Sequence, residues 1–454
     1  MPTSESFFRA RRVLLPEGLR PASVHVRAGR VSRVADFDDV PAGAPIVEVP
    51  DDAVLMPGVV DSHVHINEPG RTTWEGFATA TAAAAAGGVT TLVDMPLNSI
   101  PPTTSVAALM TKVEASEGQC RVDFGLWGGA VPGNDGDLRP LLQAGALGFK
   151  CFMVDSGVDE FPHCREEDLR AAMRQLADQD APLLVHAELG GPIEAALAAG
   201  LGPPRSYASY LRSRPRQAED EAIALLLSLC RAAPARLHVV HLSSASALPL
   251  LRTARDEALP ISAETTPHYL FLAADEIPDG ATAYKCAPPI RERDNREALW
   301  GALAEGLVSV VVTDHSPCTP ELKRLDLGDF SEAWGGIASL QLGLSIVWTE
   351  AQARGHSLAE VSSWLSAGPA KLAGLGQRKG RIAPGLDADL VIFAPDRSFQ
   401  VDADALLHRN KVTPYAGRTL RGVVEATYVR GEEVFGGGKL IGGPRGRWLK
   451  RGEL

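Results

Sequence analysis

The chain has 454 residues, and because an α/β barrel alone occupies about 250 residues, this length favours one large domain and one smaller one. Hydrophobic residues make up 45% and charged residues 22% of the sequence, which excludes a disordered chain. No apolar run reaches the roughly 20 residues of a membrane-spanning helix. The 45 basic and 56 acidic residues give a formal net charge of -11, which argues against a nucleic-acid partner and favours small-molecule chemistry. Without an apolar run of spanning length, we expect no membrane partner either.

The six cysteines, at positions 120, 151, 164, 230, 286 and 318, form no CxxC pair and no dense cluster. This spacing predicts neither a disulfide framework nor a thiolate zinc site, and it is typical of a reducing cytoplasm. The N-terminal stretch 1–19 has no apolar run long enough for a signal peptide before basic residues and Pro16 interrupt it. We therefore expect an untargeted cytoplasmic protein.

Short alternating β-branched runs occur at both ends of the chain. Residues 7–56 contain two such runs separated by Ala28-Gly29-Arg30, which predicts a hairpin. The same texture returns in 388–396 and in 422–435, where Gly431 is the expected turn. We expect residues 1–56 and 376–440 to meet in one small composite β-sandwich domain.

Between these ends, almost wholly apolar runs alternate with helical patterns such as 74–88 and 167–179, which is typical of buried parallel strands with crossover helices. Eight runs predict a (β/α)8 TIM-type barrel of the α/β class over 57–375. We expect the polar, basic residues 441–454 to form a solvated tail. The eight runs are 59–66, 88–95, 122–131, 146–153, 182–188, 236–243, 260–266 and 308–314.

Polar side chains stand at the carboxyl ends of several of these runs. His63 and His65 are two residues apart, so on a strand both point to one face. Taken alone, such a pair is as often two hydrogen-bonded histidines of the core as it is a metal site. Active sites of these barrels lie where the strands end, so the further polar residues there favour a metal site. The full candidate set is His63, His65, Lys150, His186, His241 and Asp314.

Lys150 lies between Phe149 and Cys151, where an ammonium group is strongly desolvated. Its head could reach the barrel mouth or pair with Asp314. Beside four imidazoles, an amine that reacts with carbon dioxide to form a carbamate fits better, because an ammonium would repel metal ions. We expect this carbamate to bridge two divalent ions, zinc by preference, with cobalt, manganese or iron also compatible with the donors. One ion would be held by His63, His65 and Asp314, and the other by His186 and His241.

At these residues the sequence resembles the amidohydrolase superfamily, in its branch of dihydroorotases, hydantoinases and allantoinases, over essentially the whole chain. Among these it is most similar to allantoinases. The resemblance implies metal ligands at the six positions above, an N6-carboxylated Lys150, Asp314 as proton shuttle, a composite terminal sheet re-entered at 380–393, and a homotetramer. The matching stretches are 56–77 (MPGVVDSHVHINEPGRTTWEGF), 94–103, 148–162, 238–248, 263–270, 285–291 and 311–318.

The residues around the site narrow the choice among the substrate classes of this branch. Dihydroorotases place an arginine two residues after the HxH pair, where this chain has Asn67, although Arg71 could serve instead. Hydantoinases carry a tyrosine shortly after the carboxylated lysine, and 152–162 contains none. The resemblance further implies that Asn98, Cys286 and Ser316, or their backbones, contact the substrate; equally, they could be loop-capping or buried residues.

Taken together, these features predict a metal-dependent hydrolase that opens the hydantoin ring of allantoin to give allantoate in purine catabolism, with a small ureide as its partner and no organic cofactor. A hydantoinase or dihydropyrimidinase and a dihydroorotase remain alternatives. A metal-free, non-enzymatic structural relative of hydantoinases is the alternative of another class. The presence of residues suited to bind metal at all six positions argues against it.

Overall fold

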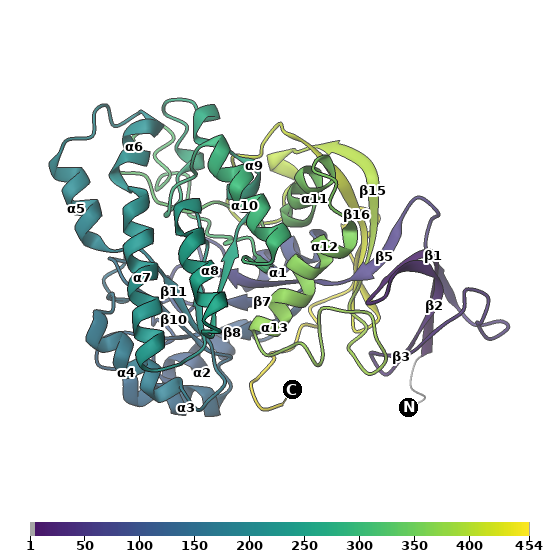
Figure 1. The fold of residues 1–454 in the computed structure, drawn as a ribbon. Coiled ribbons are helices and arrows are strands. Elements are labelled where there is room, and N and C mark those ends of the chain that lie inside the picture. The colour runs from purple at the N-terminus through teal and green to yellow at the C-terminus, as the bar shows by residue number, and fades with distance from the viewer. Residues whose placement is uncertain (1–4, 454) are drawn as a thin grey trace.

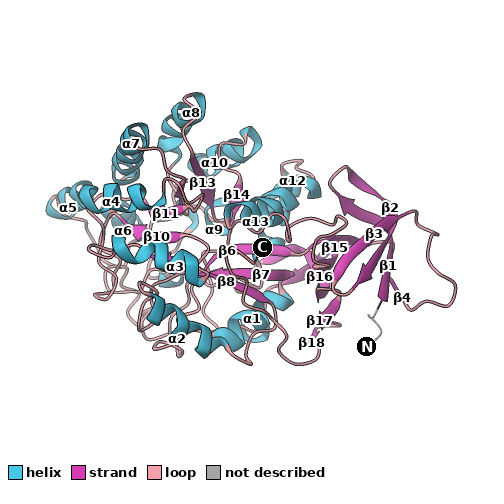
Figure 2. Cartoon of the chain, turned by 90° about the horizontal axis from the view of Figure 1, so that it is seen from below, coloured by secondary structure: helices cyan, strands magenta, loops and turns pink. Residues whose placement is uncertain are grey.

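The computed structural model describes residues 5–453 and consists of a barrel with a smaller sheet beside it (Figure 1). Residues 1–4 of the N-terminal stretch and residue 454 of the expected tail lie outside the described residues. Helices surround the barrel strands, and the terminal sheet lies to one side of them (Figure 2). No helix among the residues described is long and apolar enough to cross a membrane.

Strands from both ends of the chain form one nine-stranded sheet with the order β18-β17-β16-β15-β5-β1-β2-β3, in which β4 pairs with β1. The sheet folds over on itself, since Phe8 and Tyr428 stack edge to face at 4.9 Å although three strand pairings separate them. The predicted sandwich is thus confirmed. Its strands are β1 (Glu5–Leu15), β2 (Gly18–Arg27), β3 (Arg30–Ala35), β4 (Ile46–Glu48), β5 (Val54–Pro57), β15 (Leu390–Gln400), β16 (Thr419–Val429), β17 (Glu432–Gly436) and β18 (Lys439–Leu440).

Both expected hairpin turns are present. Ala28 and Gly29 have φ values of 53° and 78°, and Arg430 and Gly431 have φ values of 51° and 76°. Two successive left-handed residues match the twist of a two-residue hairpin, and glycine adopts this conformation without strain. The two turns also abut, because a Cβ on Gly29 would lie 3.1 Å from the Cβ of Arg430. The turns therefore help to join the two ends of the chain.

All eight predicted barrel runs contain strands, and the run 122–131 contributes two short ones. The barrel closes between β6 and the residues after β14, where His65 N donates to His315 O at 2.8 Å and Val64 bridges His315. The predicted fold class is confirmed. The strands are β6 (Val59–Val64), β7 (Val89–Asp94), β8 (Asp123–Leu126), β9 (Gly128–Gly129), β10 (Phe149–Phe152), β11 (Leu183–His186), β12 (Leu237–Val239), β13 (Ile261–Thr265) and β14 (Val310–Val311).

The helices follow local signals. The alanine-rich α1 ends at Gly87, and α4 carries three acidic residues in its first turn, where they complement the helix dipole. The helices are α1 (Phe77–Ala86), α2 (Val106–Ser116), α3 (Leu138–Ala144), α4 (Glu166–Leu176), α5 (Gly190–Ala198), α6 (Tyr207–Ser213), α7 (Arg216–Ala232), α8 (Leu248–Asp256), α9 (Pro267–Phe271), α10 (Arg293–Glu305), α11 (Gly343–Ala353), α12 (Leu358–Ser362) and α13 (Gly368–Leu372).

The C-terminal segment is not the solvated tail that its composition predicts. Phe124 N donates to Arg447 O at 3.0 Å, and Leu449 N donates to Phe124 O at 2.7 Å. Leu449 is 2% exposed. The physical reason is that β10 begins only at Phe149, so the first half of β8 has an unpaired edge, which this segment covers.

A buried charge network joins the barrel to the terminal sheet. Lys379 Nζ lies 2.7 Å from Asp123 and Asp389 and 3.0 Å from Asp387, and all four side chains are almost fully buried. Arg430, at the turn between β16 and β17, also pairs with Asp123. Burial opposes the charge on Lys379, but the three carboxylates overcome it and raise its pKa. The lysine thus balances carboxylates from both parts of the chain.

We predict that Lys379→Met lowers the free energy of unfolding by about 3–5 kcal/mol, because it leaves buried carboxylates without their cation. Denaturant titration of the wild type and the variant measures the loss. Lys371→Met, which removes an exposed lysine of α13, is the matched control and should change stability little. A Lys379→Met protein as stable as this control would contradict the prediction.

Candidate metal centre and active site

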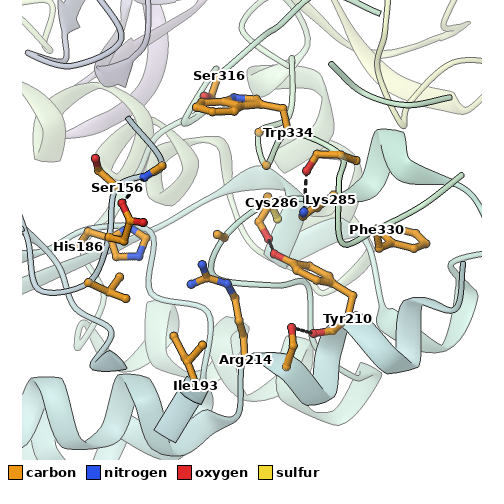
Figure 3. A pocket seen from close by; sticks show the side chains of 18 of the residues that line it. Ser156, His186, Ile193, Tyr210, Arg214, Lys285, Cys286, Ser316, Phe330 and Trp334 are labelled. Carbon is orange, nitrogen blue, oxygen red and sulfur yellow. Dashed lines mark hydrogen bonds between the residues drawn. The ribbon is translucent and has the colours of Figure 1, made fainter. Parts of the chain in front are cut away.

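A cavity of about 860 Å³ opens where the barrel strands end, at the face where such barrels hold their active sites. In Figure 3, Ser316 and Trp334 lie on one side of it, Tyr210 and Arg214 on the opposite side, and His186 between them. Strand ends, α5, α6 and the loop 330–336 form its walls. All six residues expected to bind metal line it, namely His63, His65, Lys150, His186, His241 and Asp314.

His63, His65 and Asp314 form one compact group. His63 is on β6 and His65 directly follows it, while Asp314 follows β14 across the barrel seam. Asp314 Oδ1 lies 3.2 Å from His63 Nε2 and 3.5 Å from His65 Nε2. One ligand atom from each residue fits within 4.8 Å of the others, as a single metal ion requires. These three side chains thus lie together, as expected from their positions at the ends of strands.

His186 and His241 form a second group beside the first, with the rings of His63 and His241 5.4 Å apart between centroids. His186 ends β11, and His241 follows β12 with a left-handed φ of 37°. His186 Nδ1 lies 3.0 Å from His241 Nε2, and the other ring nitrogen of His241 is buried without a hydrogen-bond partner among the described residues. Burial lowers the pKa of both imidazoles, which keeps them neutral. Two neutral ring nitrogens directed at one point suit a cation.

Lys150 lies on β10 and is only 1% exposed, yet its Nζ has no hydrogen-bond partner among the described residues. Its Nζ lies over the face of Phe152, 4.8 Å from the ring centroid. Burial lowers the pKa of Lys150 to about 8. An unpartnered amine among four imidazoles and a carboxylate fits a carboxylated lysine beside divalent ions. The donor set contains no thiolate.

Two buried carboxylates, Glu264 and Glu188, orient the imidazoles, and neither is among the residues expected from the sequence. Glu264 accepts hydrogen bonds from His63 Nδ1 at 2.5 Å and from His238 Nε2 at 3.0 Å. Each bond fixes the tautomer of the histidine and directs its other nitrogen. Burial opposes ionisation, but the two histidines overcome it and hold the pKa of Glu264 at about 2. Its position near the end of the seventh predicted run is the signal that could have identified it.

Glu188 has the same relation to His186. It accepts a hydrogen bond from His186 Nε2 at 2.7 Å and pairs with Arg214 at 2.5 Å. Burial raises the pKa of this carboxyl group, but Arg214 and His186 overcome that effect and hold it at about 2. Because Glu188 is two residues after His186, a continued strand pattern would have indicated its shared face. Arg214 lines the cavity, and nothing in its sequence context indicated this.

The structure brings the three expected substrate contacts to the same cavity, since Asn98, Cys286 and Ser316 all line it. Asn98 has a left-handed φ of 66°, and its side-chain amide lies 3.3 Å from His65 Nδ1. The Cys286 carbonyl accepts a hydrogen bond from Tyr210 Oη at 2.6 Å, and burial raises the pKa of the Cys286 thiol to about 12. Cys286 is thus a neutral thiol.

The two positions that distinguish related enzymes, position 67 and the segment after Lys150, are not where this cavity obtains its arginine and its tyrosine. Asn67 and Arg71 are not among the cavity-lining residues, since Asn67 is buried and Arg71 donates to Asn98 O at 2.9 Å and pairs with Glu160. Position 67, where dihydroorotases place an arginine, therefore lies outside the surface of this cavity. Tyr210 supplies the aromatic hydroxyl in this cavity from α6, far along the chain from Lys150.

Comparison with known proteins agrees with this site. The model described as Amidohydrolase family matches residues 54–434. The chain is 54% identical over 452 residues to a protein named allantoinase from Streptomyces avermitilis, covering 99% of this chain and 100% of the relative. It is 50% identical over 384 residues to a protein named allantoinase from Saccharomyces cerevisiae, covering 84% and 82% of the two chains.

Among solved structures, the L-hydantoinase (dihydropyrimidinase) from Arthrobacter aurescens superposes with a TM-score of 0.91 at 31% identity, covering 98% of this chain and 99% of that one. The cavity geometry, the family match over most of the sequence and the relatives that span nearly all of it lead to the same conclusion. The chain belongs to the amidohydrolase family.

Proposed function

We propose that the chain hydrolyses the cyclic amide of allantoin to give allantoate. The observation that carries the proposal is the His63, His65 and Asp314 cluster beside the unpartnered Lys150, inside a cavity large enough for a small ring. The full-length similarity to proteins named allantoinase supports allantoin as the substrate. Zinc, the cytoplasmic location and the homotetramer stay predictions from the sequence.

The residues of the chain fit two divalent ions. His63, His65 and Asp314 would hold one ion and His186 and His241 the other, and a carboxylated Lys150 would be shared. For the carbamate to form, the neutral Lys150 amine attacks the carbon of carbon dioxide and releases one proton. When bound, the ions supply the chemistry of lowering the pKa of a water molecule and polarising a carbonyl oxygen.

Asp314 carries the proton in the proposed reaction. Its Oδ atom takes the proton from the attacking water as the new C–O bond forms, and it then gives this proton to the ring nitrogen as the C–N bond breaks. Burial raises the pKa of Asp314, but His63 and His65 overcome this effect and hold it below its ordinary value. Asp314 is therefore a carboxylate at neutral pH, as a proton acceptor must be.

The cavity walls suit a neutral ureide. Asn98, Cys286 and Ser316 contribute polar side-chain or backbone groups that can bond its amides. The cavity also contains the Arg214 guanidinium, which Glu188 neutralises. An anionic substrate would have to compete with Glu188 for this arginine, whereas a neutral one would not.

We predict that the metal-loaded protein opens allantoin with a kcat/KM at least about tenfold above its value for hydantoin, dihydrouracil or dihydroorotate. The ureido arm of allantoin finds polar partners that the smaller rings lack. Ring opening is followed directly for the four compounds in parallel. A clear preference for dihydrouracil or hydantoin would make the protein a hydantoinase or dihydropyrimidinase, and a preference for dihydroorotate would make it a dihydroorotase.

We predict that Lys150→Ala lowers the metal content from about two ions per chain to about one or fewer and lowers kcat/KM at least about 100-fold. Elemental analysis and steady-state kinetics measure the two effects. Short carboxylates with excess metal should restore part of the activity in Lys150→Ala. Lys150→Arg is the matched control, since guanidinium cannot form a carbamate; near-normal turnover in this variant would disprove carboxylation.

Carboxylation also predicts a pH dependence. Because the pKa of Lys150 is about 8 rather than the ordinary 10.5, about a tenth of this amine is neutral at pH 7, some 300-fold more than for an exposed lysine. At a fixed concentration of dissolved carbon dioxide, activation of metal-free protein should accelerate from pH 6 to pH 8 and then level off. The carbamate signal from ¹³C-labelled carbon dioxide provides a second measurement. A rate independent of pH would contradict the prediction.

We predict that Asp314→Asn folds normally but loses about 10²- to 10⁴-fold in kcat, because the amide cannot accept the proton. Since the pKa of Asp314 lies below its ordinary value of 3.8, activity lost by the wild type between pH 7 and pH 5 belongs to deprotonation of the attacking water instead. Thermal unfolding checks the fold, and a pH profile checks the assignment. Retention of most of the wild-type rate by the variant would rule out the shuttle role.

A further inference from the structure

Lys323 is a buried cation that is held by backbone carbonyls. Its side chain is 3% exposed, and among the described residues it forms no ion pair with a carboxylate. Its Nζ donates instead to three backbone carbonyls, at 3.1 Å to Lys285, at 3.0 Å to Trp334, and to Gly336. An ammonium group has three N–H donors, so these carbonyls use all of them.

The three carbonyls belong to two segments that both line the cavity, 285–287 and 333–336. Further bonds join the same segments: Gly336 N donates to Lys285 O at 2.8 Å, and Lys285 Nζ donates to Ala333 O at 2.5 Å. Trp334 N also donates to Leu322 O, beside Lys323, at 2.8 Å. Figure 3 shows Lys285, Cys286 and Trp334 together on this wall. Lys323 thus lies at the centre of the hydrogen bonds that join segments 285–287 and 333–336.

The wall has little room to shift. A Cβ on Gly336 would lie 2.2 Å from Ser316 O, so this segment is packed directly against one expected substrate contact. Another expected contact, Cys286, immediately follows Lys285. None of the three carbonyls comes from a residue of the metal centre. A side chain that holds these segments together therefore sets the position of the substrate-facing wall without acting on the metal ligands.

We propose that Lys323 is a positioning residue, which holds segments 285–287 and 333–336 at the distance that substrate binding requires. The inference rests on the proposed function for its substrate, but its structural part does not. Burial of an ammonium group is unfavourable, and the pKa of Lys323 is lowered accordingly. Such a group is useful here because one cation draws three carbonyls to a single point, which no apolar side chain can do.

The kinetic test compares Lys323→Met with the wild type and with Lys439→Met, which removes an exposed lysine of β18. Lys323→Met should raise KM for allantoin about 10- to 100-fold while the metal content per chain stays at the wild-type value. Lys323→Arg should not restore KM, because a planar guanidinium cannot direct three donors to one converging set. An unchanged KM, or a loss of metal that accounts for the loss of activity, would overturn the proposal.

Trp334 provides a measurement that needs no activity. Its ring packs edge to face against Trp74 at 4.8 Å, so its emission reports the position of the wall. The difference between each protein and its Trp334→Phe counterpart isolates this one indole among the seven tryptophans. Lys323→Met should shift this difference to longer wavelength and increase its quenching by acrylamide, and Lys439→Met should not. No change in Lys323→Met would overturn the proposal.

Two further measurements distinguish a failure of the Lys323 proposal from a failure of folding and from a failure of the proposed function. Should Lys323→Met fail to fold, Lys323→Gln, which keeps two N–H donors, should show the same shift in Trp334 emission to a smaller degree, and its absence overturns the proposal. Should the wild type not open allantoin, the proposed function fails while the Trp334 measurement still decides the role of Lys323. The kinetic arm is then repeated with whichever of the four ring compounds the wild type opens.

Discussion

The seam of the barrel is the constraint on which the site depends. Asp61 on β6 accepts a hydrogen bond from Thr313 Oγ1 at 2.5 Å and others from the backbone N–H groups of Thr313 and His63. Burial raises the pKa of Asp61 to about 6. This one carboxylate joins β6, the first strand of the barrel, to the residues that follow β14, the last strand of the barrel. It therefore fixes how closely His63 and Asp314 approach each other across the seam. The catalytic geometry therefore follows from closure of the barrel.

Three buried lysines lie in different surroundings, and these surroundings give each ammonium group a different set of contacts. Lys379, between the barrel and the terminal sheet, is surrounded by carboxylates and stays charged. Lys150 has no hydrogen-bond partner among the described residues, and burial lowers its pKa to about 8. Lys323 is held by carbonyls alone. The surroundings of the nitrogen thus decide the contacts and the pKa of each of these three buried lysines.

Much of the fold could be predicted from the sequence, because burial of a strand imposes a regular spacing of apolar residues along the chain. Eight apolar runs located the barrel strands, and alternation located the terminal sheet, since fully buried and half-buried strands differ in their patterns. The docking of Leu449 against β8 could not be predicted, because the free edge depends on where β10 begins. Local composition gives no information about a gap between strands that are distant in sequence.

For the site, the sequence by itself determined which polar residues stand at strand ends, and this brought His63, His65 and Asp314 to one face, because strand ends of a closed parallel barrel converge. Only the tertiary structure decided the surroundings. Glu188 and Glu264 gain their importance from the imidazoles they contact, and Tyr210, Arg214 and Lys323 reach the cavity or its wall from helices and loops. Such contacts join residues far apart in the chain, and no spacing encodes them.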